Sequence, residues 1–268
     1  MSKQENLLIV IDPTQDEQAA MERAVITAQL RQPTPKLTLF VGVDEQAIDT
    51  GAGNTAVYRD AEWFTQLTEP LRNAGLEFNA EVCWSPQWAE AIIATAQKCE
   101  ADLIIVPDNS AQQSRRRFTD TKWNLLRKAE CPVLIVRPGA SNQRQTVLAA
   151  VKMQDDNESY QTLNKKILNR GKWMADLYGA EFHVVNSYSG SMNYPDRGVI
   201  TRMVDMDVQN IHVVQGQPDE AVAEVAKEIN ADIVVIGTLK RSGILAAMRG
   251  NTSEWVMSKV ETDIMTLN

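Results

Sequence analysis

The residues with the clearest chemical potential lie close to the C-terminus. A β-branched run, 233–236, leads into a glycine and a polar loop, and the loop ends where a helix-like segment begins. This order of strand, glycine-containing loop and helix start holds phosphate in many proteins, because backbone amides at the helix start point at the ligand. The pattern predicts a cofactor or anion site that is made by Gly237, Thr238, Lys240, Gly243, Gly250, Asn251, Thr252 and Ser253.

The same residues also have a purely structural interpretation. Asn251 or Thr252 can cap a helix by accepting hydrogen bonds from its first amides, and Gly237 can let the chain turn where a strand ends. Lys240 adds positive charge to a phosphate site in the first interpretation, whereas its side chain blocks the path of the phosphate in the second. Both interpretations stay open from these residues alone.

The loop belongs to an internal repeat of the whole chain. The sequence ADLIIVPDNS at 101–110 matches ADIVVIGTLK at 231–240, and 119–136 matches 250–267, with offsets of 130 and 131 positions. A repeat of this length indicates two copies of one domain rather than a solenoid. We expect the domains to span 1–140 and 145–268, with the second one abbreviated and carrying the glycine-rich loop.

Each copy alternates short apolar runs with helix-periodic segments. We expect strands at 7–11, 36–43, 77–84, 102–107 and 132–138 in the first copy, and at 146–151, 181–188, 210–216, 232–237 and 263–267 in the second. Continuous apolar strands that alternate with helices predict parallel sheets with helices on both faces. The segment 189–207 contains Gly190, Pro195 and Gly198 and is expected to be a loop.

The two copies together resemble tandem-type universal stress proteins, in particular their E subgroup. The resemblance is carried by LLIVIDPTQDEQAAMERAV near the N-terminus and VVIGTLKRSGILAAMRGNTSEWV near the C-terminus, and it covers nearly the whole chain. It implies an α/β fold with two tandem Rossmann-like domains, each a mostly parallel five-stranded sheet with helices on both faces. It also implies that the two domains pair with each other through their last strands, PVLIV and DIMTL.

Nucleotide-binding members of this family carry Gly-x2-Gly-x9-Gly followed by Ser or Thr, and an Asp at the end of the first strand. In the second copy Gly237 and Gly250 match the first and third glycines. Lys240 stands at the second glycine, Asn251 at the hydroxyl position and Lys152 at the acid. The resemblance therefore implies a nucleotide site that is altered at three of its defining positions.

The first copy departs from the family pattern in a different way. Asp12 fits the acid at the end of the first strand, but the corresponding loop, PDNSAQQSRRRFTDTKW at 107–123, contains no glycine. Pro107 and Asp108 stand where the second copy has Gly237 and Thr238, and a carboxylate at this place repels phosphate. We interpret the first copy as a structural partner domain.

Composition limits the classes of partner. The net charge of −8 and a pI of about 5.0 argue against binding to nucleic acid or to an anionic membrane. No apolar run reaches the length of a membrane span. Three cysteines without close spacing fit a reducing compartment, so we expect a cytoplasmic protein. His183 and His212 lie in expected strands and are interpreted as packed residues rather than metal ligands.

We predict a non-enzymatic cytoplasmic stress-response protein, a tandem module whose second domain weakly binds an adenine nucleotide such as ATP or another small anion. Its partners would be an unidentified protein or a small-molecule ligand, and a homodimer stays open. The alternative is a slow ATPase or ATP-dependent switch that uses the 237–253 loop. A dinucleotide-dependent oxidoreductase is disfavoured, because its glycine fingerprint follows the first strand and VIDPTQD has no glycine.

Overall fold

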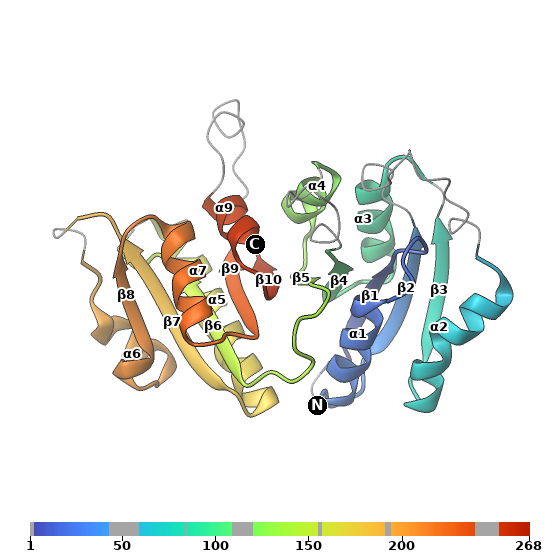
Figure 1. Cartoon of the computed structure of the whole chain (residues 1–268), viewed down its shortest axis with the longest axis horizontal. Coiled ribbons are helices and arrows are strands. Elements are labelled where there is room, and N and C mark those ends of the chain that lie inside the picture. The colour runs from blue at the N-terminus through green and yellow to red at the C-terminus, as the bar shows by residue number, and fades with distance from the viewer. Residues whose placement is uncertain are drawn as a thin grey trace. The chain divides into compact units, whose positions relative to one another are not determined.

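The computed structural model shows two compact units, residues 1–138 and 139–268 (Figure 1). It describes residues 3–42, 59–83, 85–108, 120–154, 157–190, 194–238 and 252–268. The division falls within the polar segment 137–146. The domain limits expected from the sequence, 1–140 and 145–268, stay a prediction.

The first unit is a five-stranded parallel sheet. Its strands are β1 (Asn6–Ile11), β2 (Lys36–Gly42), β3 (Phe78–Cys83), β4 (Leu103–Pro107) and β5 (Val133–Val136), in the spatial order β3-β2-β1-β4-β5. The helices are α1 (Ala19–Gln29), α2 (Ala61–Asn73), α3 (Trp88–Lys98) and α4 (Asp120–Lys128). Helix α1 contacts α2, and α3 contacts α4, which fits right-handed crossovers that place one pair on each face.

The second unit repeats this topology. Its strands are β6 (Thr146–Val151), β7 (Glu181–Tyr188), β8 (Ile211–Gln215), β9 (Ile233–Gly237) and β10 (Asp263–Leu267), in the order β10-β9-β6-β7-β8. The helices are α5 (Glu158–Tyr178), α6 (Arg197–Val204), α7 (Pro218–Glu228) and α9 (Thr252–Lys259), with a 3-10 turn at Val208–Asn210. The α/β fold class with two Rossmann-like five-stranded sheets is confirmed.

The central strands are buried on both faces, as continuous apolar runs require. Every residue of β1 from Leu7 to Ile11 is at most 1% exposed, and Ile233 to Val235 of β9 are fully buried. Helix α5 begins after Asn157, whose side chain accepts from the Ser159 amide, and ends at Gly179, which has a φ of +65°. Polar residues such as Asp12, Lys152 and Thr238 follow these strands directly and therefore lie at the edge of each sheet where its strands end.

The expectation of a loop at 189–207 is wrong, because part of this segment forms helix α6. The Asp196 side chain accepts from the Gly198 amide at 2.7 Å and caps the helix. Pro195 precedes the cap and Gly198 lies in the first turn, where neither residue interrupts an internal hydrogen bond. Burial of Ile200 and Val204 holds the short helix to the unit. None of the helices that the structure describes is long and apolar enough to cross a membrane.

Candidate functional site

Those predicted nucleotide residues that the structure describes lie at the edge of the second sheet where its parallel strands end. Strand β9 ends at Gly237, and helix α9 begins at Thr252. The Ser253 hydroxyl donates to the Gly237 carbonyl oxygen at 2.8 Å, so the two ends of the loop lie close together. The other predicted residues, Lys240, Gly243, Gly250 and Asn251, lie outside the described residues.

Thr238 is engaged by the chain itself. Its amide donates to the Leu267 carbonyl oxygen at 2.7 Å, and its side chain is 7% exposed. The hydroxyl lies 3.4 Å from the same carbonyl and forms a further hydrogen bond with the side chain of Asn268. Thr238 therefore ties the end of β9 to the end of β10, and a phosphate would have to compete for its hydroxyl.

Gly237 is explained by packing against helix α5. A Cβ atom at this position would lie 2.5 Å from Leu163 Cδ2 and 2.9 Å from Ile167 Cδ1. Such distances are well inside van der Waals contact, so the strand can approach the helix this closely only without a side chain. The first glycine of the family motif thus has a structural role here that is independent of any ligand.

We expect Gly237→Ala to lower the free energy of unfolding by about 1–3 kcal/mol, because the added methyl overpacks the contact with α5. Urea unfolding would measure the loss, and a Leu163→Ala background should reduce it. Gly190→Ala is the matched control, since a Cβ at Gly190 meets no atom of the described residues within 4 Å. Equal stability of the two alanine variants would contradict the packing role.

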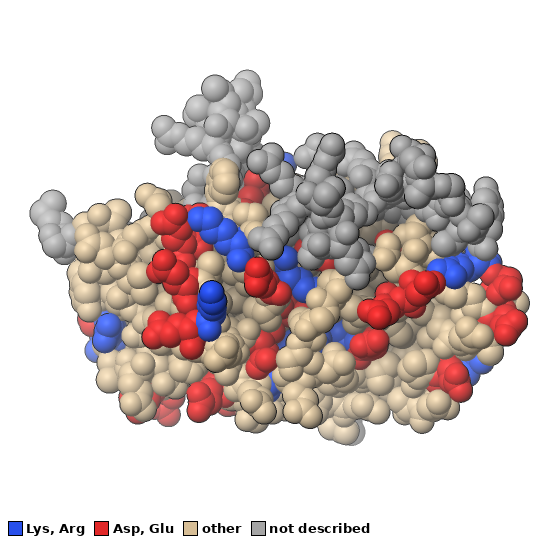
Figure 2. Space-filling model, viewed as in Figure 1, with Lys and Arg blue, Asp and Glu red and all other residues tan. Residues whose placement is uncertain are grey.

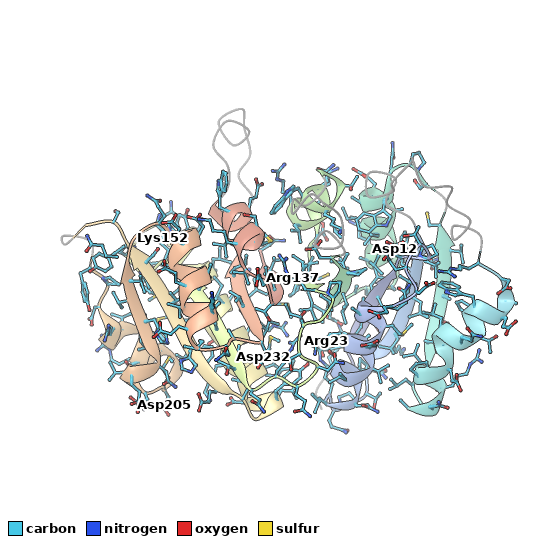
Figure 3. All side chains as sticks on the ribbon, in the orientation of Figure 1. Asp12, Arg23, Arg137, Lys152, Asp205 and Asp232 are labelled. Carbon is cyan, nitrogen blue, oxygen red and sulfur yellow. The ribbon has the colours of Figure 1, made fainter. Side chains whose placement is uncertain are left out.

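Lys152 occupies the position at which the family pattern has an acid. It follows β6 directly, and both its backbone amide and its carbonyl are bonded to the side chain of Asn164, at 3.1 and 2.8 Å. The Lys152 ammonium lies 4.5 Å from the centre of the Tyr160 ring (Figure 3). This edge of the second sheet therefore carries a cation that attracts anions but cannot accept a hydrogen bond from an adenine amine.

Asp12 takes the corresponding position in the first unit. Its carboxylate accepts from the Thr14 amide at 2.9 Å and from the Thr14 hydroxyl at 2.6 Å, which forms a tight turn after β1 (Figure 3). A pocket of about 330 Å³ lies beside the next residue, Pro13. Arg59 donates to the Pro13 carbonyl oxygen and stacks over the Trp63 ring, and all three residues line this pocket. Sequence reasoning missed the pocket, because its walls come from four separate segments.

Asp108 stands where the second copy has Thr238, and the backbone confirms the match. The Asp108 amide donates to Val136, the last residue of β5, just as Thr238 donates to the last residue of β10. The Asp108 carboxylate is fully buried, 3.3 Å from the Lys122 ammonium and 3.6 Å from the Arg137 guanidinium. The first copy has therefore filled this position with internal ion pairs.

The two histidines lie against each other on neighbouring strands of the second sheet. His183 Nδ1 is 3.1 Å from His212 Nε2, and the rings stack with centroids 5.3 Å apart. The other ring nitrogen of His183 is 3.4 Å from a carboxylate oxygen of Glu181. Burial, followed by the charge of His183, lowers the pKa of His212. The two rings are packed against each other, and one N–H between His183 Nδ1 and His212 Nε2 is enough to form the hydrogen bond that joins them.

We expect the stability of the protein to fall when the pH drops below 6.5, the ordinary pKa of histidine. The folded state disfavours protonation of His212, so the unfolded chain binds more protons between the lowered pKa and 6.5. This contribution is fully present above pH 6.5 and is lost as the pH falls through that window. Urea unfolding between about pH 7.5 and 5.5 would measure it. An unchanged pH dependence in His212→Gln would contradict this origin.

The described surface is mixed in charge. On the face shown in Figure 2, acidic side chains form several groups, and the described residues of that face present no broad basic area. This distribution agrees with the net charge of −8. A ligand anion would thus be held by local groups such as Lys152 rather than by a general positive field.

Comparison with known proteins gives a consistent result. The model of the universal stress protein family matches residues 4–137 and 206–267. A universal stress protein E homolog from Haemophilus influenzae is 27% identical over 98% of this chain and 97% of its own. The universal stress protein E of Escherichia coli is 27% identical over 100% of this chain and 95% of its own. The crystal structure of a protein from Pseudomonas aeruginosa that is described as a universal stress protein superimposes on this chain with a TM-score of 0.78. The two sequences are 26% identical, and the match covers 98% of this chain and 92% of the other.

Proposed function

Since the chain belongs to the universal stress protein family, we propose that it is a cytoplasmic stress-response protein that acts by binding rather than by catalytic turnover. Its second domain would bind an adenine nucleotide, such as ATP, or another small anion weakly. Binding would change the surface that the tandem module offers to a protein partner. All three cysteines are free thiols, as in proteins of reducing compartments.

One observation carries this proposal: the cation Lys152 lies at the edge of the second sheet where the strands end. Strand β9 ends at the same edge, and the loop that follows it leads to the start of α9. Positive charge and a helix start both favour an anion there. The hydroxyls of Thr238 and Ser253 are meanwhile bonded to the chain's own carbonyls. A phosphate must break these bonds, which is why we expect the affinity to be weak.

Calorimetric titration with magnesium-ATP and with inorganic phosphate tests the proposal. We expect a dissociation constant near or above about 100 μM for ATP, in place of the tight binding of an intact phosphate cradle. Lys152→Gln should weaken binding about threefold to tenfold. Lys165→Gln, a change of an exposed lysine on α5, is the control. Submicromolar binding of ATP, or no effect of Lys152→Gln, would count against the proposed site.

The alternative is a slow ATPase or an ATP-dependent switch that uses the 237–253 loop. It predicts phosphate release from ATP by the purified chain, and it predicts that Gly250→Asp abolishes this release by placing a carboxylate at the helix start. A coupled phosphate assay on both proteins distinguishes the alternatives. Release that survives in Gly250→Asp would reject the ATPase, and no release from either protein would favour the binding module.

A further inference from the structure

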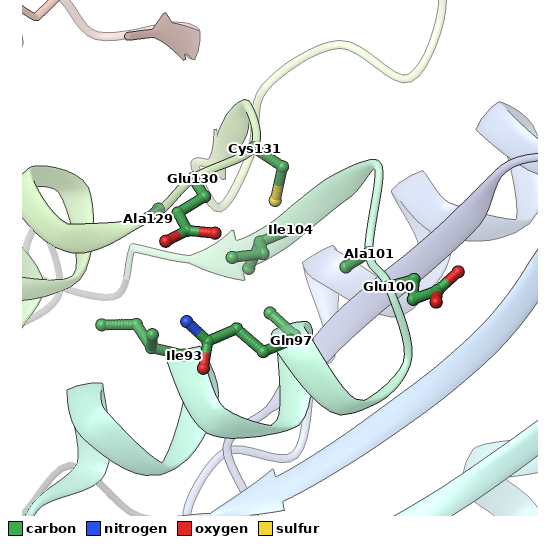
Figure 4. A pocket seen from close by; sticks show the side chains of 9 residues that line it. Ile93, Gln97, Glu100, Ala101, Ile104, Ala129, Glu130 and Cys131 are labelled. Carbon is green, nitrogen blue, oxygen red and sulfur yellow. The ribbon is translucent and has the colours of Figure 1, made fainter.

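A second pocket lies in the first unit, at the edge where the strands begin and thus opposite the edge that carries Asp12. It has a volume of about 410 Å³ and lies between the C-terminal ends of α3 and α4 (Figure 4). The lining comes from both helix ends and from the residues that lead into β4 and β5. Its volume falls within the range of small-molecule sites.

The floor and most of the walls are apolar. Ile104 of β4 is fully buried and forms the floor, and Ile93, Ala96 and Ala101 contribute to the walls. The thiol of Cys131 faces the same space (Figure 4). Burial raises the pKa of this thiol to about 11, so it stays protonated at neutral pH and acts as a further apolar wall. The floor therefore offers an apolar surface for a compact hydrocarbon body.

The rim of the pocket is negative. Figure 4 shows the Glu130 carboxylate and the Gln97 amide on either side of Ile104, with Glu100 at the outer rim. Within the part of the chain that the structure describes, neither Glu100 nor Glu130 has an ion-pair partner. The carbonyl ends of α3 and α4 add the negative poles of two helix dipoles.

The lysines closest to the pocket in sequence are engaged elsewhere. The Lys98 ammonium lies 2.5 Å from a carboxylate oxygen of Glu81. The Lys128 ammonium lies 2.7 Å from a carboxylate oxygen of Glu90. Both ammonium groups are thus paired with carboxylates that do not line the pocket. The negative charge of the rim is consequently left for a ligand to complement.

The second copy provides an internal comparison, because its helix α7 matches α3 with the offset of 130 residues. There Gln97 is replaced by Lys227 and Glu100 by Asn230, and Glu100 and Asn230 share a left-handed backbone with φ near +50°. The repeat tolerates a cation and a neutral amide at these places. Glu130 is matched by Glu261, so Glu100 is the acidic residue of the rim that is specific to the first copy and not required by the fold.

From this geometry we infer that the pocket between α3 and α4 binds a small organic cation, an ammonium group on a compact apolar body. The hydrocarbon would lie on Ile104 and the side chains around it, and the ammonium would reach Glu130, while Glu100, whose carboxylate is directed outward, adds negative charge at the outer rim. This site is distinct from the proposed nucleotide site, since it lies in the other unit and at the opposite edge of the sheet.

A charge series on one skeleton tests the inference on the full chain. Phenylbutylamine, phenylbutanol and phenylbutyrate differ at one end only, and calorimetry would rank their affinities. We expect the amine to bind about tenfold more tightly than the carboxylate. Methyl NMR signals of Ile93 and Ile104 should shift on addition of the amine. Equal affinity for all three compounds, or no detectable binding of the amine, would overturn the proposal.

Variants with the residues of the second copy complete the test. Gln97→Lys combined with Glu100→Asn should weaken amine binding about tenfold without loss of folding, because both residues occur at the same backbone positions in the second unit. Glu77→Gln, which removes an exposed carboxylate outside the pocket, is the control and should bind as the unaltered protein does. Undiminished amine binding in the double variant would overturn the site.

Discussion

Asp263→Ala is expected to lower the free energy of unfolding by about 3–5 kcal/mol, because it leaves a buried guanidinium without its carboxylate. Asp263 begins β10 and is fully buried, and its carboxylate lies 3.0 Å from Arg144 Nη2. The Arg144 side chain is 1% exposed and stacks 5.0 Å from the centre of the Tyr178 ring. Water cannot reach the guanidinium to replace the lost partner.

Urea unfolding of matched variants separates the ion pair from general packing. Asp176→Ala removes one partner of the exposed pair between Lys172 and Asp176 on α5, and we expect it to cost about 0.5 kcal/mol or less. Replacing both buried partners, Arg144→Met with Asp263→Leu, should be milder than Asp263→Ala, since no charge is then left unpaired. If Asp263→Ala were as stable as the Asp176→Ala control, the stabilising role of the buried ion pair would be contradicted.

The elements of the fold were predictable because their signals are local. Helix α5 is an example, since Asn157 and Gly179 mark its ends through short-range hydrogen bonding and backbone freedom. The repeat then predicted that both halves of the chain share one alternation of strands and helices. Helix α6 was missed because proline and glycine were interpreted as breakers, although they lie before and within the first turn.

The candidate sites were predictable only in part, because their properties depend on distant residues. The sequence places Gly237 at a strand end, but its contact with Leu163 joins positions 74 residues apart and appears only in the packed unit. The pocket between α3 and α4 likewise needs residues from 93 to 131 to come together. A family motif therefore identifies positions, whereas the packing around them decides whether a glycine or a hydroxyl is available to a ligand.

Asp108 places a buried carboxylate where the second copy has Thr238, and its replacement should have the second large effect. Asp108→Thr installs the residue that the second copy has at Thr238, and it leaves Lys122 and Arg137 without the carboxylate between them. We expect a loss of about 3 kcal/mol, at the lower end for buried pairs, because the side chains of Lys122 and Arg137 are 10% and 13% exposed. Urea unfolding would measure the loss, with Thr238→Ser as a mild control.

Anions should restore part of that stability, since a sulfate bound between the two cations stabilises only the folded state. The rise in melting temperature with added sulfate should then be larger for Asp108→Thr than for the unaltered protein. Sulfate dependence that is identical in the two proteins would show that the cations are not directed at a common anion position. Restored sulfate binding would instead indicate that a single carboxylate separates the closed first copy from an open anion site, while the second copy keeps its own cation at Lys152.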